Sequence, residues 1–335
     1  MSSHQHRHSH QHQQHADIDW DALAPVLESG AEMHRPLSAQ AAAWVAEQLP
    51  ADDVRRVFDI GSGPGVLTCL LAETFPHAEV VAVDATPQLL DRALARAARS
   101  GFGDRVRVHA AEAPDGLEEL GTADLIWAGN SVHHMGDQRL ALGAFAERLR
   151  PGGLIAVLEG GLQARHLPRD IGIGRPGLES RIDGASSVWF EEMRAALPGY
   201  TAVVEHWPAL LAAAGLSDAR SRSFLLDIPA PLTADQREQL VSAFSWLRSV
   251  VEGRMDEEDL AVLDRLLDPD DEQGFMHRPD SFLLAARTVH TARHQHSAKT
   301  YAVSSTPAYA AAAISTQAIS PTPAIRNPVR VSDGR

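Results

Sequence analysis

The sequence predicts an α/β protein built around a doubly wound parallel sheet. Short β-rich runs recur between residues 55 and 158, and segments with helical periodicity separate the early ones. Several runs are almost continuously apolar, which is typical of parallel strands buried on both faces. Alternating strands and helices favour right-handed crossover connections. With 335 residues, the chain allows two domains or one large α/β domain with insertions.

Five strands and the helices between them are expected before residue 160. The strands are RRVFDI, EVVAVD, RVRVHA, ADLIWA and GLIAVL, at 55–60, 79–84, 105–110, 123–128 and 153–158. Apolar residues share one helical face after each of the first two strands, namely Val66, Leu67, Leu70 and Leu71, and then Leu89, Leu90, Ala93, Leu94 and Ala97. Helices at about 19–30 and 37–48 make residues 17–54 an N-terminal helical segment.

The alternation breaks after Glu159, where helical insertions are expected. They cover residues 162–205 and 229–280, and the second contains two helices at 233–251 and 256–268. Between the insertions we expect a helix over 206–216 that ends at Gly215, and then a strand over 221–228. A last strand, SFLLAARTVHTA, is expected at 281–292. We interpret the insertions as elements that cover a site.

Composition narrows the possible partners. Lys and Arg total 30 against 44 Asp and Glu, a net charge of −14, which argues against a nucleic acid or an anionic membrane as the main partner. The single cysteine, Cys69, excludes an intrachain disulfide and fits a reducing compartment. No secretory signal is expected, because a His/Gln tract opens the chain. These features predict a soluble, cytoplasmic protein.

Both ends of the chain are expected to be disordered tails. Residues 1–16 are rich in His and Gln, and residues 297–335 are rich in Ala, Ser, Thr and Pro. Alternating histidines can bind Zn or Ni, but this tract has no apolar anchor that could fold around a metal. No metal site is therefore predicted.

The strongest local motif is VFDIGSGPG at 57–65, a strand followed by a glycine turn and a helix. Glycines allow a ligand to approach the backbone, and a helix N-terminus favours an anionic group. A dinucleotide fingerprint needs glycine at the first, third and sixth positions, whereas Val66 occupies the sixth position here. Asp59 would repel a pyrophosphate and attract an α-ammonium group. The motif therefore disfavours NAD.

Asp84 ends the second strand, one strand away from this turn. A carboxylate at this place can accept hydrogen bonds from both hydroxyls of a ribose, and it would repel a 2′-phosphate. The alternative is that Asp84 caps the following helix.

These segments together resemble class I S-adenosylmethionine-dependent methyltransferases. VFDIGSGPG, VVAVD, ADLIWAGNSVHH and RLRPGGLIAVLE are similar to the successive sheet motifs of that family, most of all in its small-molecule branch of bacterial quinone and natural-product enzymes. The resemblance is specific over about 55–160 and looser over 206–292. It implies a Rossmann-like, seven-stranded sheet of order 3-2-1-4-5-7-6 with an antiparallel last strand, and a methyltransferase domain over 55–296.

The resemblance implies where the methionine end of S-adenosylmethionine would bind. It assigns this end to Asp59 and to the turn that follows it, Gly61, Ser62, Gly63 and Gly65. Asn130, after the fourth strand, would lie beside the sulfonium. From the residues themselves, Arg35 could pair with the cofactor carboxylate, or it could be a solvated surface arginine.

The nucleoside end would lie along the second and third strands. Asp84 would bind the ribose, with Ala85 next to it. Glu112 and Ala113 would line the adenine, although Glu112 stands where the family more often has Asp.

The acceptor is expected to be a small, partly apolar molecule. Methyl transfer is an in-line displacement, so the protein has to align the nucleophile and exclude water. Aromatic residues of the insertions either line an acceptor pocket or only pack the insertions together, namely Trp189, Phe190, Trp207, Phe244 and Trp246. His133 and His134 follow Asn130 and are candidate bases; one of them could instead cap the helix at Asp137.

Two other functions compete with the methyltransferase interpretation. A non-catalytic module could keep the nucleoside pocket and bind S-adenosylmethionine or adenosylhomocysteine without transfer. An NAD-dependent oxidoreductase is disfavoured by the missing sixth-position glycine.

Overall fold

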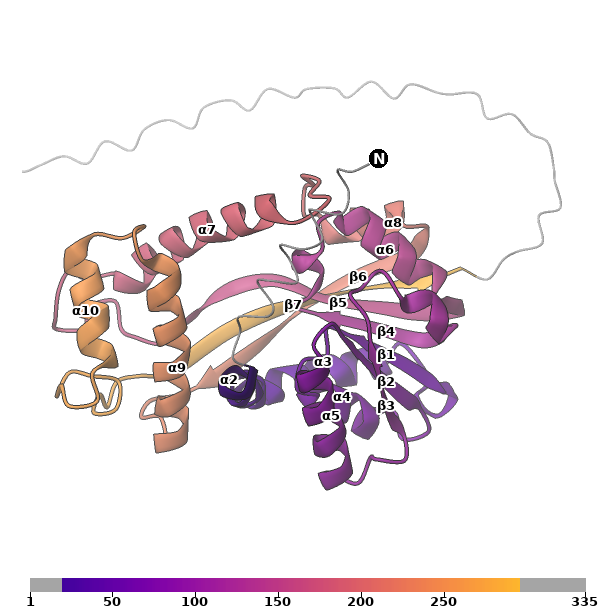
Figure 1. Ribbon diagram of the computed structural model, residues 1–335, viewed down its shortest axis with the longest axis horizontal. Helices are drawn as coiled ribbons and strands as arrows, with labels where there is room; N and C mark the ends of the chain where they lie inside the picture. The colour runs from indigo at the N-terminus through magenta and orange to yellow at the C-terminus, as the bar shows by residue number, and fades with distance from the viewer. Residues whose placement is uncertain (1–19, 296–335) are drawn as a thin grey trace, which may run out of the picture. The chain divides into compact units, whose positions relative to one another are not determined.

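The computed structural model describes residues 20–295, and both predicted tails lie outside the described residues. Seven strands form one sheet in the order β3-β2-β1-β4-β5-β7-β6 (Figure 1). The first five strands run parallel, and β7 is antiparallel to both of its neighbours. The predicted α/β class, strand order and antiparallel last strand are confirmed.

The parallel half of the sheet forms where the sequence predicts it. Its first four strands are β1 (Arg56–Ile60), β2 (Glu79–Asp84), β3 (Val106–Ala110) and β4 (Ala123–Gly129). β1 is central and almost completely buried, because it pairs with β2 on one side and β4 on the other. The carboxyl ends of β1, β2 and β4 therefore meet at one edge of the sheet.

Helices cover both faces of this sheet. One face carries α3 (Arg35–Ala46), α4 (Val66–Thr74) and α5 (Pro87–Arg99), and the other carries α6 (Gln138–Glu147) and α8 (Trp207–Ala213). Each face has its own apolar core, with Phe75 and Trp127 among the residues of the first and Phe58 and Phe145 among those of the second. Three short 3-10 helices, η1 (Ala51–Asp53), η2 (Leu117–Leu120) and η3 (Val132–His134), complete the connections.

Two strands, β5 and β6, are longer than the sequence predicts, and β7 has the predicted length with both ends shifted by two residues. β5 (Leu149–Arg165), β6 (Leu216–Ile228) and β7 (Leu283–His294) extend past the rest of the sheet toward α9 and α10 (Figure 1). Past Leu158, β5 pairs with β7 alone. Gly161 makes this possible, because a Cβ there would lie 2.2 Å from the carbonyl oxygen of Ala286. The insertion expected at 162–205 therefore begins as strand, and Leu216 opens β6 instead of ending a helix.

The long strands carry a helical lobe with a separate core. The lobe consists of α7 (Leu178–Ala196), α9 (Ala234–Val251) and α10 (Glu257–Leu267). Thr233 and Gln236 form a capping box at the start of α9, and Asp256 caps α10. Phe244 and Phe275 are fully buried and pack with their ring centroids 4.7 Å apart. The predicted helices at 233–251 and 256–268 are present within one residue at each end.

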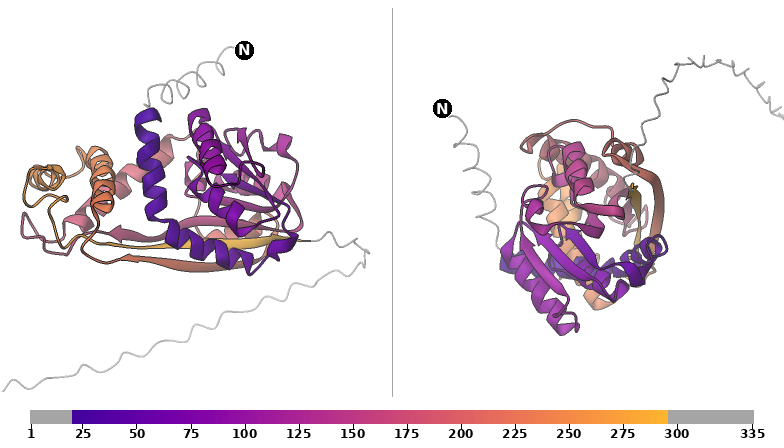
Figure 2. Two further views of the ribbon diagram at one scale, coloured as in Figure 1. Left: turned by 90° about the horizontal axis from the view of Figure 1, so that it is seen from below. Right: turned by 90° about the vertical axis from the view of Figure 1, so that its right-hand side faces the viewer.

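The first helix, α2 (Trp20–Met33), stands between this lobe and the sheet helices (Figure 2). It contacts α9 on one side and α4 and α5 on the other. Glu28 and Glu32 of α2 both pair with Arg96 of α5. The N-terminal helical segment thus packs across the edge of the sheet where the glycine turn lies.

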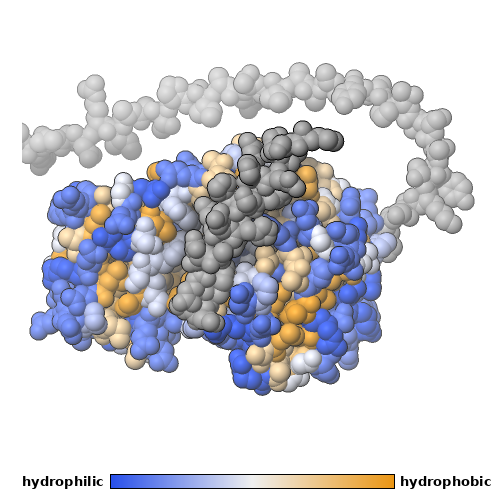
Figure 3. Space-filling model, viewed as in Figure 1, coloured by the Kyte–Doolittle hydropathy of each residue, from blue (hydrophilic) through white to orange (hydrophobic). Residues whose placement is uncertain are grey.

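The surface is mixed, with hydrophilic residues interrupted by apolar stripes on the face seen in Figure 3. Large apolar side chains that remain exposed include Leu162 of β5 and Trp246 of α9. Among residues 20–295, no helix is both long and apolar enough to span a membrane.

Candidate functional site

The glycine turn connects β1 to α4 at the carboxyl edge of the sheet. Gly61 has a φ of +70°, and a Cβ at this position would lie 2.6 Å from Cβ of Ser131. A residue without a side chain is therefore needed where the turn meets the loop after β4. α4 begins directly behind the turn at Val66, so its first amides lie at the same edge.

The amides of the turn already donate hydrogen bonds within the protein. Those of Gly61 and Ser62 reach the carbonyl oxygen of Val83 at 2.8 and 3.0 Å. The amide of Gly63 reaches Oδ2 of Asp84 at 3.0 Å. These bonds fix the turn against β2. A ligand can approach the backbone of this turn closely.

The position of Asp84 is compatible with both of its predicted roles, which are to bind a ribose and to cap the helix that follows. Its Oδ2 accepts the Gly63 amide, and its Oδ1 accepts the amide of Thr86 at 2.9 Å, just before α5 begins. A carboxylate has about four acceptor positions, so each oxygen can still accept another hydrogen bond. The side chain is half-buried, and its position is thereby fixed at the end of β2.

Asp59 is buried at the end of β1. Its Oδ2 accepts the hydroxyl of Thr68 at 2.6 Å, and only 1% of the residue is exposed. Burial raises the pKa of Asp59 to about 7, the Thr68 hydrogen bond opposes this shift, and the charge of Asp84 adds to it. A buried carboxyl group with a raised pKa gains from a cation placed beside it.

A cavity of about 470 Å³ opens at this turn. Its volume lies in the range of small-molecule and cofactor sites. Two buried polar atoms of its lining residues, Oγ of Ser62 and Nε1 of Trp127, have no hydrogen-bond partner among the described residues. Buried polar groups are normally paired, so these two atoms fit a bound polar ligand. Further lining residues are Asp59, Gly61, Gly63, Leu67 and Asn130.

The N-terminal helices close this first cavity. Gly30 and Ala31 of α2, His34, and Arg35 and Ser38 of α3 line it. Nη2 of Arg35 pairs with Oε2 of Glu73 at 2.7 Å, and both side chains are well exposed. Arg35 is thus at the cavity, as the clamp interpretation requires, and it also makes the surface ion pair that the alternative predicts.

The residues expected at the nucleoside end lie outside the first cavity. Ala85 and Glu112 are exposed, Ala113 is half-buried, and none of them lines the cavity, nor does Asp84. They follow the carboxyl ends of β2 and β3, which are neighbours in the sheet. The cavity therefore covers the expected methionine half, and the expected nucleoside half lies along the adjacent open edge.

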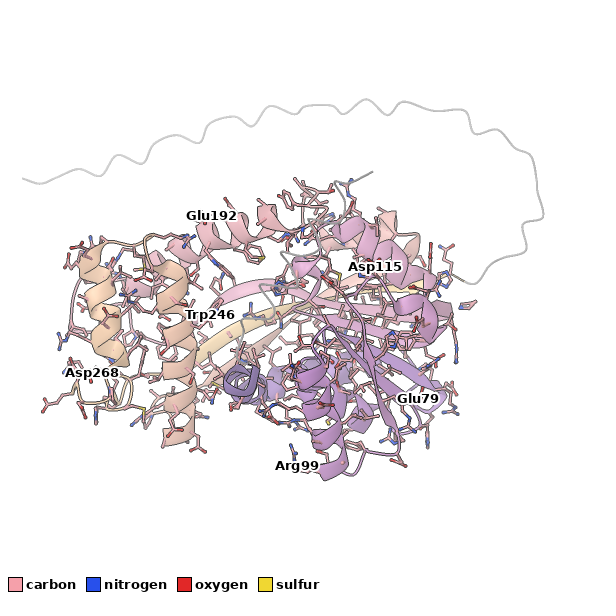
Figure 4. The ribbon with its side chains drawn as sticks, viewed as in Figure 1. Glu79, Arg99, Asp115, Glu192, Trp246 and Asp268 are labelled. Carbon is pink, nitrogen blue, oxygen red and sulfur yellow. The ribbon has the colours of Figure 1, made fainter. Side chains whose placement is uncertain are left out.

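A second cavity, of about 610 Å³, lies between the extension of β5 and the helices α7 and α9. Figure 4 places Trp246 on the side of α9 toward the long strands. Trp189 and Trp246 pack edge to face with their centroids 5.4 Å apart. Four of the five aromatic residues considered for an acceptor pocket line this cavity, namely Trp189, Phe190, Phe244 and Trp246.

Trp207 is the exception among these aromatic residues. It starts α8, is 5% exposed, and belongs to the core under α6 and α8. Its indole stacks on His290 with centroids 6.1 Å apart. Trp207 lines neither cavity described above, so for this residue the packing interpretation holds.

His133 lines the second cavity and pairs with a buried carboxylate. Its Nδ1 lies 2.8 Å from Oε2 of Glu159, whose Oε1 accepts the amides of Val132 and His133 at 2.9 and 3.3 Å. The Glu159 side chain is 6% exposed and that of His133 is 19% exposed. Because Nδ1 faces the carboxylate, Nε2 is the nitrogen left for other partners.

His134 is placed differently from His133. It is exposed, and it lines neither of the two cavities. The helix cap that was considered for this pair comes from Asp137, whose Oδ1 accepts the amides of Arg139 and Leu140. Neither histidine caps α6.

Asn130 and Arg287 line both cavities. Asn130 directly follows β4 and has a φ of +51°, and its amide donates to the carbonyl of Leu158 at 3.0 Å. Arg287 lies on β7, opposite Gly161 of β5 and Phe224 of β6. The two cavities therefore meet at the carboxyl end of β4 and over the extension of β5 and β7.

Sequence reasoning missed Glu159 and Arg287 as site residues. Each interrupts an apolar strand: Glu159 ends the run LIAVLE, and Arg287 is the cation within SFLLAARTV. A charge within a strand that is otherwise buried is rarely left without a role. The sequence contains that signal, but it does not indicate the length of β5, which brings the two residues together.

Among residues 20–295, no group of three or more His, Cys, Asp or Glu side chains is arranged to hold a metal ion. Cys69 is a buried free thiol of α4.

Comparison with known proteins gives a family for the parallel half of the sheet. The profile of a family described as a methyltransferase domain matches residues 58–155. Trans-aconitate 2-methyltransferase of Rhodopseudomonas palustris (strain BisB18) is 39% identical over 140 residues, which cover 42% of this chain and 49% of that enzyme. Methyltransferase tpcM of Aspergillus fumigatus is 40% identical over 100 residues, 30% of each chain. The chain thus matches about half or less of the length of these relatives.

Solved structures also resemble the chain. A precorrin-6y C5,15-methyltransferase of Geobacter metallireducens aligns with 76% of this chain and 87% of its own, at 14% identity and a TM-score of 0.42.

The strand order, the glycine turn and the matched profile together define the class. Residues 58–155 match a methyltransferase domain, and they lie in a sheet with the strand order that the resemblance to class I S-adenosylmethionine-dependent methyltransferases implies. S-adenosylmethionine is the cofactor of that class, and the unpaired polar atoms and the size of the first cavity fit its methionine end.

Proposed function

We propose that the protein transfers the methyl group of S-adenosylmethionine to a small-molecule acceptor. The observation that carries this proposal is the junction of two cavities at Asn130 and Arg287. One cavity lies at the glycine turn, and the other is lined by aromatic residues. A donor and an acceptor bound in them would meet at this junction, which is the geometry that an in-line displacement needs.

The cofactor would bind with its methionine end in the first cavity. When bound, S-adenosylmethionine supplies an electrophilic methyl group on its sulfonium. Asp59 would face the α-ammonium group, Arg35 the carboxylate, and Asn130 the sulfonium region. The turn residues Gly61, Ser62, Gly63 and Gly65 would provide the close surface, and Asp84, Ala85, Glu112 and Ala113 would bind the nucleoside along the open edge.

The acceptor would bind in the second cavity, with His133 as its general base. Glu159 holds the His133 ring by Nδ1, and so directs Nε2 to a hydroxyl, amine or acid proton of the acceptor. Trp189 and Phe190 of α7, together with Phe244 of α9, would exclude water from the reacting atoms.

Binding and turnover test this proposal separately. Isothermal titration with adenosylhomocysteine should give saturable binding, and Asp84→Ala should weaken it about tenfold or more, since two ribose hydrogen bonds are lost. Methyl transfer is then assayed with labelled S-adenosylmethionine and trans-aconitate, the acceptor named for the bacterial relative, alongside other small acids, phenols and amines. Binding without transfer to any acceptor would favour a non-catalytic module. Absence of binding at millimolar nucleoside would overturn the proposal.

We also propose a domain organisation of the chain and a cellular location. We propose that residues 55–296 are the catalytic domain, that 17–54 close the cofactor side, and that the inserted helices cover the acceptor. A reducing, cytoplasmic setting is supported by the single, buried cysteine.

A further inference from the structure

We propose that the acceptor is an anion, a carboxylate on a partly apolar body, and that Arg287 binds its carboxylate. This inference rests on the proposed function, because it assigns the substrate class of the same second cavity. It starts from a cation, Arg287, that lines both cavities and forms no ion pair with any of residues 20–295.

Arg287 lies in the middle of the extended part of the sheet. β5 and β6 flank it, since Arg287 pairs in register with Gly161 and Phe224. No described residue forms a hydrogen bond with its guanidinium or an ion pair with it, whereas Arg165, Arg181 and Arg278 each have a carboxylate partner. Burial lowers the pKa of Arg287, an effect that the charge of Glu159 opposes. An arginine stays protonated in proteins, so this site holds an uncompensated positive charge.

The carboxylates of the second cavity are already supplied with donors. Glu159 accepts from His133 and two amides, and Glu179 accepts from Nδ1 of His166 and from the amides of His166 and Leu167. The remaining acidic residues of the lining are Asp183, which pairs with Arg165 at 2.5 Å, Glu205, which accepts from Gln138 at 3.2 Å, and the exposed Glu191. Arg287 is the one Lys or Arg side chain that lines this cavity, and no described carboxylate forms an ion pair with it, so a ligand carboxylate is complementary to this point of the lining.

The histidines around the cavities strengthen this complementarity. Nδ1 of His166 faces Glu179, and Nδ1 of His34 faces the carbonyl of Gly30 at 2.9 Å. Arg287 lines the first cavity together with His34 and the second cavity together with His166. Each histidine keeps its Nε2 for a further partner. A carboxylate at Arg287 would therefore meet several nitrogen atoms, and the aromatic residues would pack against the rest of the molecule.

The cofactor carboxylate is the other anion that Arg287 could bind. The position of Arg287 favours the acceptor, because Gly161 lies two residues beyond Glu159, on the part of β5 that has left β4. Arg35 lines only the first cavity and is thus better placed for the cofactor.

The test compares acids with neutral counterparts in the presence of saturating adenosylhomocysteine. The probes are cinnamate against cinnamamide, and trans-aconitate against its trimethyl ester, with binding measured by calorimetry. We expect at least one acid to bind tenfold or more tightly than its neutral counterpart, since a bidentate arginine–carboxylate pair contributes about a tenfold to hundredfold preference. Arg287→Gln should abolish the preference, and Arg287→Lys should keep part of it.

Arg222→Gln is the matched control. Arg222 lies on the adjacent strand β6, is exposed, and lines neither cavity, so its loss should leave the acid preference unchanged. Equal binding of acid and neutral probe by the wild type, or no binding of either, overturns the inference. Arg287→Gln that weakens adenosylhomocysteine itself by tenfold would assign Arg287 to the cofactor and also overturn it. Loss of nucleoside binding by the wild type would instead contradict the proposed function.

Discussion

Asp59 and His133 show how single residues acquire their chemistry from the positions that the fold gives them. Asp59 is buried at the end of the central strand, and its carboxyl group has a single hydrogen-bond donor, Thr68. Its pKa is raised to about 7 chiefly by burial. His133 has one ring nitrogen fixed by Glu159. In both cases the sequence indicates the residue type, while the burial and the partner come from the tertiary structure.

The raised pKa of Asp59 predicts that adenosylhomocysteine binds more weakly in acid. The α-ammonium group would favour the ionised carboxylate, so binding below pH 7 must release a proton from Asp59. Affinity should therefore rise with pH, by at most about tenfold per unit, and level off above about pH 7. Titration calorimetry in two buffers of different ionisation enthalpy measures both the affinity and the proton release. Asp59→Asn should remove this pH dependence, and a constant affinity in the wild type from pH 5.5 to 8 would contradict the argument.

The pair of His133 and Glu159 predicts a defect in turnover that leaves cofactor binding intact. Glu159→Gln keeps an acceptor for the two amides but removes the charge that stabilises a protonated His133. We expect kcat to fall about tenfold to hundredfold, which is within the usual contribution of a positioned base. Adenosylhomocysteine affinity should stay unchanged, as measured by calorimetry. His134→Gln is the comparison, because its ring lies outside both cavities; a larger loss in that variant would reverse the assignment.

At the scale of elements, helix α7 is connected to the loop that carries His133. Arg194, 6% exposed near the end of α7, donates to the carbonyl oxygens of His133 and Met135 at 2.6 and 2.7 Å. A helix of the inserted lobe thereby holds a loop that belongs to the parallel sheet. This connection makes the position of His133 depend on α7.

Arg194→Met is therefore expected to reduce both stability and turnover. Two buried carbonyl groups would lose charged donors, which costs about 2–4 kcal/mol in the free energy of unfolding. Denaturant titration measures that loss, and kcat reports the displaced His133. Arg254→Ala is the control, since Arg254 pairs with Glu192 of the same helix at the surface, and exposed pairs contribute about 0–1 kcal/mol. Equal effects of the two substitutions would contradict the special role of Arg194.

The elements themselves were largely predictable, because their signals are local. Apolar runs and glycine turns indicated β1 to β4 nearly to the residue, and the helix expected at 233–251 is present as α9. The extensions of β5 and β6 were not predictable. Residues 159–165 and 216–220 are polar or glycine-rich, and only pairing with β7 makes them strands. Neighbouring strands supply that stabilisation, which no local pattern records.

At the scale of the whole molecule, the three largest apolar clusters of the described residues lie in separate places. Two lie on the faces of the sheet, and the third lies inside the α7, α9 and α10 lobe. The sequence indicated the first two through buried strands and amphipathic helices. It did not indicate that the second cavity would lie between the lobe and the strands, because this depends on how far β5 extends.

Separate cores predict that damage to the lobe spares the cofactor half. Phe244→Ala removes a fully buried ring from the third core and should lower the free energy of unfolding by about 3–5 kcal/mol. Adenosylhomocysteine affinity, measured at a temperature where the variant is folded, should remain close to that of the wild type. Phe75→Ala, in the core beside α4, is the matched substitution and should weaken nucleoside binding as well. Loss of nucleoside binding in the Phe244 variant would show that the halves are coupled.

The long strand β5 runs from the parallel sheet into the extension that carries the lobe. Gly160 and Gly161 lie where its pairing with β4 ends. Residues of β5 as far as Leu158 pair with β4 and must keep the geometry of the parallel sheet. The residues from Gly161 onward pair only with β7 and lie beside the lobe. Substitutions in the outer part can therefore accumulate without disturbing the inner part. Such substitutions would alter the proposed acceptor cavity and leave the proposed cofactor site unchanged.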